Sequence, residues 1–591
     1  MVDKEKDINK LENLRHSTAH LLAAAVMELW PNTKRAIGPS IENGFYFDFD
    51  FGDVKITEED FPKIEAKMRE ILPSWKSFEK HELDANEARN EYPDNPYKHE
   101  MIDEFSEKGK KKVSFYKSGD YWDLCRGGHI EHPDKKLQNF KLLSVAGAYW
   151  RGSEKNKMLT RIYGTVFPTQ KELDEYLNNL KLEKERDHRK IGKDLDLFVF
   201  SDLVGAGLPL FTEKGATIRR ELERFTQDEE IRRGYKHVIT PHLAKTDLYR
   251  TSGHYPYYKD TMYPVMKVDE DELILRPMTC PHHFMLYKSR PRSYKELPMR
   301  IAELASQFRY EKSGELSGLM RVRLFCLADA HIISRVDQAN SVIEEVLDLI
   351  DYIAKTLGLE KGKDYRYRLS LGDRTDDKKY YKDDKAWDEA EDVLRTVLKK
   401  TKSPYFEVEG EAAFYGPKID IQMKRVSGKE ETAFTVQYDF VMPKRFNLTY
   451  INEKGKEEQP IVIHRSSIGC IERVLAFLIE KYNGNFPTWL TPVQVKVLPI
   501  AERHIEYANE VLKKLRNEEI RAELDDRNAT LPAKIRDAQM EKVSYMLVVG
   551  DKEEKKVSVS VRVRSGKDQG EQKLEEFIKN IRKEIDEKII N

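Results

Sequence analysis

Cysteine is scarce in this sequence, and long apolar runs are missing. Only four cysteines occur among 591 residues and none belongs to a CxxC pair, so we expect no disulfide framework. No uninterrupted apolar stretch approaches the roughly 20 residues that span a bilayer. The first residues, MVDKEKDINK, contain no apolar signal region. We therefore expect a cytoplasmic protein that does not enter membranes.

An excess of charge of one sign is also missing. Lysine and arginine number 102, aspartate and glutamate 103, and the net charge is −1. No overall basic field therefore indicates nucleic acid, although local patches can still supply phosphate contacts. There is no internal repeat and no low-complexity tract. A chain of 591 residues is too long for one hydrophobic core, and we expect about three domains.

Periodicity divides the chain into four parts. Mixed helices and strands over residues 1–168 predict an α+β domain, and the charged stretch 169–194 predicts a connecting helix. Residues 195–490 predict helices with an antiparallel sheet, whereas residues 491–591 alternate strand and helix, which is typical of a compact α/β module. The predicted fold class is therefore α+β and multidomain, with an α/β module at the C-terminal end.

Two distant segments carry the residues of a predicted nucleotide site. Phe308–His331 predicts a strand, a glycine-containing loop and a second strand, and His464–Glu480 predicts a strand end followed by a helix. Because alternate side chains of a strand share a face, we expect Arg309 and Glu311 on one face and Arg321 on a face of the second strand. Guanidinium and carboxylate groups placed in this way indicate a site for a polyanion, not a core.

A group of ligand-type residues also lies near the N-terminus. His16 and His20 are four residues apart on one predicted helix face, and Cys125 and His129 occur in DLCRGGH. An HxxxH pair together with a CxxxH pair indicates a zinc site. A satisfied core cluster is the other interpretation, and the residues alone leave both open.

The two nucleotide-site segments resemble motifs 2 and 3 of class II aminoacyl-tRNA synthetases. From about Leu14 to the C-terminus the chain is similar to threonyl-tRNA synthetases of the bacterial type, through MTCPHH, LADAH, EGEAAFYGPKID, TVQYDF, FPTWLTPVQV and YMLVVGDKE. A further segment, GATIRRELERFTQDEEIRRGYKHVITPHL, resembles the dimer-forming motif 1. The resemblance implies an editing domain at 1–168, a linker helix at 169–194, a class II catalytic domain at 195–490 and an anticodon-binding domain at 491–591. We expect the family's ubiquitin-like N-terminal domain to be absent.

The resemblance implies ATP-dependent activation of L-threonine and its transfer to tRNA(Thr) by a homodimer. Arg309 would bridge the amino-acid carboxylate and the α-phosphate of ATP. Glu311 would accept from the adenine amino group, and Arg473 would stack on the adenine. Arg321 would hold the β- and γ-phosphates together with Mg²⁺.

Further residues match family positions around the substrate. Lys418 and Gln437 match positions near the α-phosphate and the amino acid, Tyr415 matches a substrate-binding position, and Asp329 matches the residue that accepts from the threonine hydroxyl. The catalytic set implied by the resemblance is Arg309, Arg473 and Lys418.

Cys280, His331 and His464 match the family's zinc ligands. A thiolate and two imidazoles leave an open coordination position, which in the family meets the amino and hydroxyl groups of threonine. Valine has the same shape but no hydroxyl oxygen, so a metal in this pocket would discriminate against it.

Serine keeps the hydroxyl and lacks one methyl group, which changes binding by only about 1–3 kcal/mol. A hydrolytic editing site for Ser-tRNA(Thr) is therefore expected. In the family, His16, Lys98, Asp123 and Cys125 match residues that transfer protons and position water. His20 and His129 match residues that hold the tRNA end, and we favour hydrolysis without a metal.

At the C-terminal end, Glu553 and Arg562 match family residues that read anticodon bases. Three positions depart from the pattern of many relatives: His282 replaces a glycine, Leu327 a glutamine and Cys470 a serine. None of them removes a predicted ligand. The alternative function is a catalytically inactive paralogue that binds RNA or senses tRNA, and such proteins lose arginines or ligands that are all present here.

Overall fold

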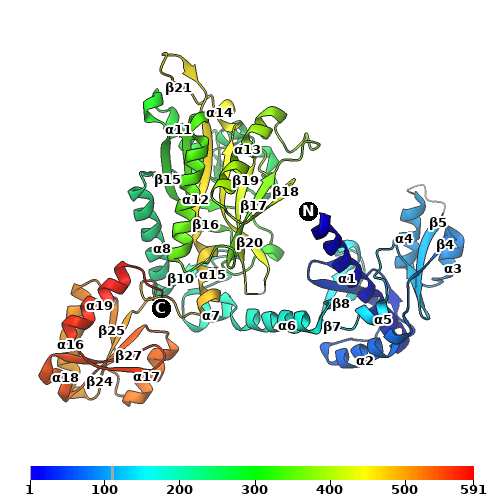
Figure 1. Cartoon of the computed structure of the whole chain (residues 1–591), viewed down its shortest axis with the longest axis horizontal. Helices are drawn as coiled ribbons and strands as arrows, with labels where there is room; N and C mark the ends of the chain where they lie inside the picture. Colours follow the sequence, from blue (N-terminus) through cyan, green and yellow to red (C-terminus); the bar gives the residue numbers. More distant parts are fainter. Residues whose placement is uncertain (1, 108–111, 427, 591) are drawn as a thin grey trace. The chain divides into compact units, whose positions relative to one another are not determined.

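The computed structural model describes residues 2–107, 112–426 and 428–590. The chain separates into two compact units, Met1–Asn179 and Leu180–Asn591 (Figure 1). The predicted boundaries at 168, 194 and 490 stay predictions. The connecting stretch contains two helices, α6 (Gln170–Glu185) and α7 (His188–Asp194). The helix is interrupted where the Asp187 side chain accepts from the backbone N–H of Arg189 and caps α7.

The first unit is built on a long helix packed against a sheet. The helix α1 (Val2–Leu29) lies on β3 (Gly44–Asp50), where phenylalanine occupies every second position. Phe45, Phe47 and Phe49 therefore point to one face and are buried together with Leu22 of α1. The strand order is β1-β3-β8-β7, with β2 beside β3. The remaining elements are β1 (Lys34–Arg35), β2 (Ser40–Ile41), β7 (Phe140–Tyr149), β8 (Met158–Val166) and α2 (Phe61–Ile71).

A smaller antiparallel sheet completes this unit. Its order is β4-β5-β6, and α3 and α4 pack against β5. The strand β6 ends immediately before Cys125, which places Asp123 on the strand and Cys125 just beyond it. The bounds are β4 (Glu79–Asp84), β5 (Lys112–Ser118), β6 (Tyr121–Leu124), α3 (Ala85–Asn90), α4 (Pro96–Glu107) and α5 (Pro133–Lys136).

The second unit contains an eight-stranded sheet of order β11-β15-β16-β23-β20-β19-β17-β18. Its pairs are antiparallel except at the two edges, where β11 is parallel to β15 and β18 to β17. The predicted antiparallel sheet is thus confirmed. The strands are β11 (Lys236–His237), β15 (Met299–Phe308), β16 (Leu324–Ser334), β17 (Tyr365–Leu371), β18 (Tyr405–Glu409), β19 (Lys418–Lys424), β20 (Glu430–Asp439) and β23 (Ile461–Cys470).

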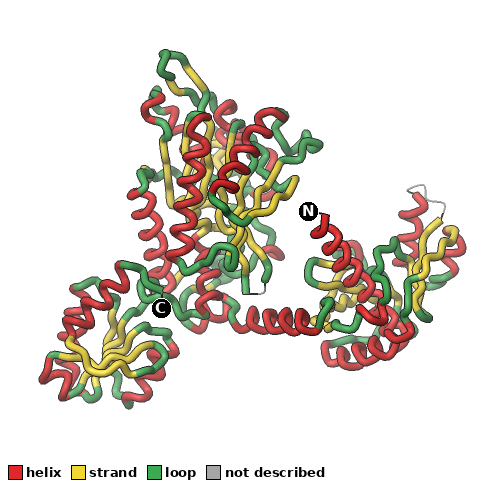
Figure 2. Tube along the Cα trace, in the orientation of Figure 1, coloured by secondary structure: helices red, strands yellow, loops and turns green. Residues whose placement is uncertain are grey.

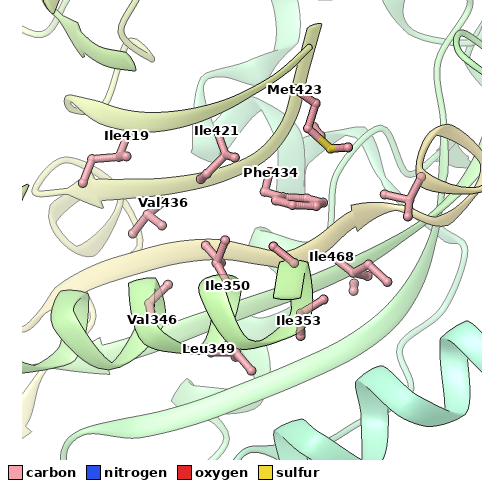
Figure 3. Close-up of a cluster of buried hydrophobic side chains, with 14 of the residues drawn as sticks. Val346, Leu349, Ile350, Ile353, Ile419, Ile421, Met423, Phe434, Val436 and Ile468 are labelled. Carbon is pink, nitrogen blue, oxygen red and sulfur yellow. The ribbon is translucent and has the colours of Figure 1, made fainter. Parts of the chain in front are cut away.

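Alternation along the central strands gives this sheet one apolar face and one polar face. On β16, Ala330 and Ile332 belong to the main hydrophobic core, whereas Asp329 and His331 point the other way. The helix α12 (Ala339–Thr356) covers the apolar face, and Figure 3 shows its side chains packed against those of β19, β20 and β23. The helices α8 (Glu213–Arg232), α13 (Asp384–Lys400) and α15 (Ile471–Tyr482) add to the same core. The polar face is left for a site.

Short elements extend the second unit around this sheet. A three-stranded sheet has the order β12-β14-β13, and two further strand pairs are β9 with β10 and β21 with β22. Their bounds are β9 (Phe198–Val199), β10 (Leu210–Phe211), β12 (Leu243–Lys245), β13 (Met266–Val268), β14 (Asp271–Leu275), β21 (Tyr450–Ile451) and β22 (Glu457–Glu458). The short helices are α9 (Thr246–Ser252), α10 (His254–Tyr257), α11 (Cys280–Lys288) and α14 (Met442–Arg445).

The C-terminal part of the second unit has its own sheet of order β25-β24-β26-β27-β28. Strands β25, β24 and β26 are parallel, and β27 and β28 continue antiparallel. Figure 2 shows helices and strands alternating here, as predicted. The elements are β24 (Val495–Pro499), α16 (Ile505–Asn517), β25 (Ala522–Leu524), α17 (Leu531–Met540), β26 (Tyr545–Val549), α18 (Asp551–Lys556), β27 (Ser558–Val563), β28 (Asp568–Lys573) and α19 (Leu574–Asp586).

The motif 2 segment differs from its prediction. Strand β15 ends at Phe308 and β16 begins at Leu324, so Arg309, Glu311 and Arg321 lie in the intervening loop and not on strand faces. This loop contains a 3-10 turn at Ser313–Glu315. Among the described residues, no helix is both long and apolar enough to cross a membrane.

Candidate functional site

The polar face of the large sheet lines a cavity of about 680 Å³. Residues from strands β15, β16, β19, β20 and β23, from the motif 2 loop and from the first turns of α11 and α15 surround it. It brings together every nucleotide, substrate and metal residue predicted for the second unit: Cys280, Arg309, Glu311, Arg321, Asp329, His331, Tyr415, Lys418, Gln437, His464 and Arg473.

A thiol and two imidazoles meet at one end of this cavity. Cys280 is the first residue of α11, and His331 and His464 are register partners on β16 and β23. All three are buried, and one ligand atom from each lies within 4.8 Å of the others. The helix start and the strand pair therefore place the three side chains predicted from distant sequence positions around one point.

Each imidazole is also held by a second group. The Nδ1 of His331 is 2.8 Å from Nδ1 of His283, and the Nε2 of His464 is 2.7 Å from Oδ2 of Asp439. One nitrogen of each ring is thus engaged and the other is left for a metal, which is the usual arrangement around metal-binding histidines.

Electrostatics agree with a cation at this point. Burial lowers the pKa of His331 well below its ordinary value, so the ring is neutral and able to bind a metal. Burial and the carboxylates of Asp329 and Asp439 raise the pKa of Cys280 well above its ordinary value. A bound cation would reverse that effect, since a coordinating thiol is deprotonated. The donor set fits Zn²⁺.

A chain of polar groups continues behind His331. The Nε2 of His283 lies 3.3 Å from Oε2 of Glu303, and Glu303 is paired with Arg276 at 2.9 Å. Burial opposes ionisation of Glu303, but hydrogen bonds from His283 and Thr240 and the Arg276 charge lower its pKa to about 2. A fixed carboxylate therefore orients His283.

The arginines occupy another part of the cavity. Arg309 is half-buried, with its guanidinium over the Phe325 ring at 5.2 Å and its Nε 3.5 Å from Pro277 O. Burial, with the nearby charge of Arg473, lowers the pKa of Arg309 below its ordinary value. An anion bound in the cavity would raise the pKa of Arg309 again, because an opposite charge nearby stabilises the charged guanidinium. Arg473 on α15 donates to the carbonyl of Thr432 at 2.7 Å and to that of Met320 at 3.1 Å, which fixes its guanidinium.

Other predicted residues pair with one another. Arg321 lies 2.7 Å from Glu311 and 2.9 Å from Glu315, so Glu311 is held by an arginine. Lys418 lies 3.1 Å from Asp420. The Tyr415 hydroxyl donates to the Gln437 side-chain oxygen, and the Tyr415 ring stacks on His464 at 5.0 Å.

Sequence reasoning missed three residues of this site. Asp439 lies two positions after Gln437 in TVQYDF, and alternation along one strand would have found it. His283 stands in MTCPHH, and the sequence alone does not distinguish it from its neighbour His282. Gln307 is buried on β15 and lines the cavity, but nothing in its sequence neighbourhood distinguishes it from a core residue.

A second cavity, of about 520 Å³, lies in the first unit. It is lined by His16, His20, Lys98, Asp123 and Cys125, and ligand atoms of His16, His20, Cys125 and His129 lie within 4.8 Å of one another. The Cys125 sulfur is 3.1 Å from His16 Nε2 and 3.3 Å from His129 Nε2. The predicted histidine–cysteine cluster therefore exists, and its geometry permits a metal.

Burial shifts the pKa values of the side chains in this cluster. Burial raises the pKa of Cys125 to about 11. Burial and the neighbouring His16 lower the pKa of His129 to about 3. Burial also lowers the pKa of His16, and more strongly that of His20. In the absence of a cation the cluster contains a thiol and neutral imidazoles near pH 7.

Asp123 is the centre of an ion-pair network beside this cluster. Lys98 lies 2.9 Å and Arg35 3.1 Å from the same Asp123 oxygen. Tyr92 donates to that oxygen at 2.6 Å, and Tyr121 donates to the other at 3.0 Å. Burial opposes ionisation of Asp123, but these cations lower its pKa well below the usual range. Arg35 was not predicted, because a lone arginine after a proline turn carries no signal.

The predicted anticodon residues occupy the C-terminal sheet. Glu553 accepts from the backbone N–H of Gly550 at 3.0 Å and caps α18. Arg562 on β27 pairs with Asp568 at 2.7 Å, and its Nε is buried without a partner among the described residues. Both side chains thus have structural contacts of their own.

Comparison with known families matches three stretches of the chain. Residues 263–482 match the tRNA synthetase class II core domain (G, H, P, S and T), and residues 494–584 match an anticodon binding domain. Residues 113–163 match the threonyl and alanyl tRNA synthetase second additional domain.

Several relatives are similar over nearly the whole chain. The threonine–tRNA ligase of Anoxybacillus flavithermus is 50% identical over 578 residues, which cover 97% of this chain and 89% of that protein. The Staphylococcus carnosus threonine–tRNA ligase is 49% identical over 577 residues, 97% of this chain and 88% of that protein.

Solved structures are similar over about two thirds of the chain. The RNA binding domain of threonyl-tRNA synthetase from Cryptosporidium parvum Iowa II superposes with a TM-score of 0.63 at 35% identity, covering 67% of this chain and 97% of that one. A putative threonyl-tRNA synthetase from Aeropyrum pernix gives a TM-score of 0.60 at 30% identity, covering 68% of this chain and 95% of that one.

Proposed function

The chain belongs to the threonyl-tRNA synthetase family and is a threonine–tRNA ligase with a class II core, and from that premise we propose how its residues divide the work. The cavity on the large sheet activates threonine with ATP and transfers it to tRNA(Thr). The observation that carries this proposal is that one cavity is lined both by the Cys280 cluster (Cys280, His331 and His464) and by three arginines. The arginines are Arg309, Arg321 and Arg473. The identity over the whole chain does not support an inactive paralogue.

Arginine chemistry supplies most of the catalysis in this proposal. Adenylate formation brings the threonine carboxylate to the α-phosphate while negative charge grows at phosphorus, so fixed cations stabilise the transition state. Arg309 bridges the two anions, and Lys418 supports it from β19. Arg473 stacks on the adenine, and Arg321 exchanges its contact with Glu315 for the outer phosphates, which Mg²⁺ shares.

The adenine and the amino acid are held by polar contacts. Glu311 accepts from the adenine amino group once Arg321 has turned toward phosphate. Gln437 and Tyr415, already hydrogen-bonded to each other, position the substrate beside Asp329. Asp329 accepts from the threonine hydroxyl.

Cys280, His331 and His464 hold Zn²⁺ in this proposal. The ion supplies a Lewis-acid position for the amino and hydroxyl groups of threonine when bound. The chain's own part is to keep both rings neutral and oriented through His283 and Asp439. Valine lacks the hydroxyl from which Asp329 would accept, so it is rejected.

The first unit hydrolyses seryl-tRNA in this proposal, and it does so without a metal. Lys98 and Asp123 are tied together by the network around Asp123, so they fix the local field. His16, whose Nε2 lies 3.1 Å from the Cys125 sulfur, takes a proton from water, and His20 and His129 hold the tRNA end. The metal-binding alternative is supported only by the cluster's geometry.

The remaining assignments complete the proposal. Glu553 and Arg562 read anticodon bases, at the expense of their present contacts with Gly550 and Asp568. The protein acts as a cytoplasmic homodimer. The domains are 1–168, 195–490 and 491–591, joined by the linker 169–194.

Exchange of pyrophosphate into ATP tests the synthetic proposal. Threonine should support exchange, valine should be at least about tenfold weaker in kcat/KM, and serine should lie nearer to threonine than valine does. Equal exchange with valine would reject the threonine pocket.

For editing, His16→Ala should let serine accumulate on tRNA(Thr) while exchange with threonine is unchanged, and unaltered accuracy would reject that assignment.

A further inference from the structure

Asp329 lies between two polar side chains that each keep one buried oxygen without a partner among the described residues. Gln307 on β15 donates its Nε2 to Oδ2 of Asp329 at 3.3 Å and to Oγ1 of Thr279 at 3.1 Å. Ser466 on β23 is the register partner of Asp329. Gln307 is 1% exposed and Ser466 4%, and both line the cavity that contains Arg309.

Two oxygen atoms in this row have no partner. The Oε1 of Gln307 and the Oγ of Ser466 are buried, and no described residue forms a hydrogen bond with either of them. Buried polar atoms are nearly always paired in native proteins, and an unpaired one calls for a specific reason such as a ligand. Here two such atoms flank the same carboxylate.

The orientation of the Gln307 amide is set by its neighbours. The NH₂ end of Gln307 faces Oδ2 of Asp329 and Oγ1 of Thr279, so its hydrogens already have acceptors. The Oε1 atom is left as an acceptor, and its partner must be a donor. Phosphate oxygens are acceptors and cannot satisfy it, whereas the amino group of threonine can.

We propose that Gln307 and Ser466 contact the bound amino acid, with their side-chain oxygens accepting from its amino group on either side of Asp329, which takes the single hydroxyl hydrogen. The proposal rests on activation of threonine in this cavity. It makes the amino-acid pocket a row of three oxygen-bearing side chains, contributed by the neighbouring strands β15, β16 and β23. The backbone register holds the row in place.

Strand alternation provides a matched control. Ser467, adjacent to Ser466, points to the opposite face and donates to Glu230 of α8 at 2.5 Å. Ser467→Ala therefore removes a buried serine hydroxyl from the same strand without touching the cavity. It should alter stability and leave the KM for threonine unchanged.

The experiment compares Gln307→Met, Ser466→Ala and Ser467→Ala by ATP–pyrophosphate exchange on the full chain. Gln307→Met should raise the KM for threonine about tenfold to a hundredfold, and Ser466→Ala by a smaller factor, with the KM for ATP unchanged. Gln307→Asn keeps the amide but withdraws it by one methylene, and should raise the KM for threonine similarly. This second variant separates loss of the contact from a change in polarity.

Exchange with valine gives a second readout, because valine has the same amino group as threonine. Gln307→Met should raise the KM for valine by the same factor as the KM for threonine, and a rise for threonine alone would contradict a contact with the amino group. The inference is overturned if wild type exchanges with threonine and both Gln307 variants and Ser466→Ala keep its KM within about twofold. A parallel rise in the KM for ATP would overturn it as well. Failure of the wild type to use threonine would instead reject the proposed function.

Discussion

His283 is the residue on which the geometry of the metal cluster depends most closely. It is fully buried between His331 and Glu303, and its ring fixes which nitrogen of His331 is available. Phenylalanine keeps a planar aromatic ring, although a somewhat larger one, and cannot form either hydrogen bond. His283→Phe should therefore weaken zinc binding by about 10–100-fold, measured by competition with a chelator.

The neighbouring histidine provides the control for that measurement. His282 is also buried on α11 but contacts neither His331 nor His464 in the described structure. His282→Phe should leave zinc affinity unchanged. Equal effects of the two substitutions would show that any disturbance of α11 suffices and that the hydrogen bond is not important.

The pH dependence of the first unit follows from the lowered pKa of His129. The folded site lowers this pKa from 6.5 to about 3. Between these values the unfolded chain binds a proton that the folded site does not, so stability is present above pH 6.5 and is lost as the pH falls. The maximum slope is about 1.4 kcal/mol per pH unit.

His129→Gln should remove that contribution. The pKa of His20 is lowered by burial and partly by the neighbouring His129, so the difference between wild type and variant reports His129 together with its coupling to His20. Amide hydrogen exchange in α1 reports the opening free energy of this unit at each pH. Parallel losses of protection in the two proteins below pH 6.5 would contradict the assignment.

At the scale of elements, the junction of β23 and α15 positions Arg473, for which we propose stacking on the adenine. Gly469 has φ +82°, and a Cβ added there would lie 2.2 Å from the carbonyl oxygen of Ala433. Gly469→Ala should lower the free energy of unfolding by about 2–4 kcal/mol. It should also reduce kcat for exchange, because Arg473 follows four residues later.

A comparison with Gly455 separates the free-energy cost of backbone strain from the cost of the steric clash. Its φ is +71°, and nothing lies within 4 Å of an added Cβ. Gly455→Ala should cost only the strain of a left-handed alanine, about 1 kcal/mol. If the two glycine variants are equally stable, the close approach of β20 to Gly469 does not constrain the junction.

Elements explain which parts of the site the sequence could predict. The period of two on β16 places Asp329 and His331 on one face, and β23 places His464 opposite His331 as its register partner. The motif 2 arginines were misplaced because a strand pattern does not show where pairing stops. Gln307 and Ser466 were missed because their importance lies in unpaired atoms, which only coordinates reveal.

At the scale of the whole molecule, the fold class follows from the order of the elements. An antiparallel sheet between two regions of different pattern was predicted and is present, and the C-terminal alternation of strand and helix is confirmed. The ligands of the metal cluster were not predictable from spacing. Cys280 and His464 are far apart in sequence. Without the structure, only the resemblance of their motifs to the family indicates that they belong to one site.

In the proposed function, the choice of threonine depends on a metal held by Cys280, His331 and His464. The most direct measurement is the zinc content of the purified wild type, Cys280→Ser and Cys125→Ser, determined by atomic emission alongside exchange with threonine. Wild type and Cys125→Ser should contain one zinc ion per chain. Cys280→Ser should contain almost none and should lose exchange. Full zinc content and unchanged preference for threonine over valine in Cys280→Ser would contradict the central claim.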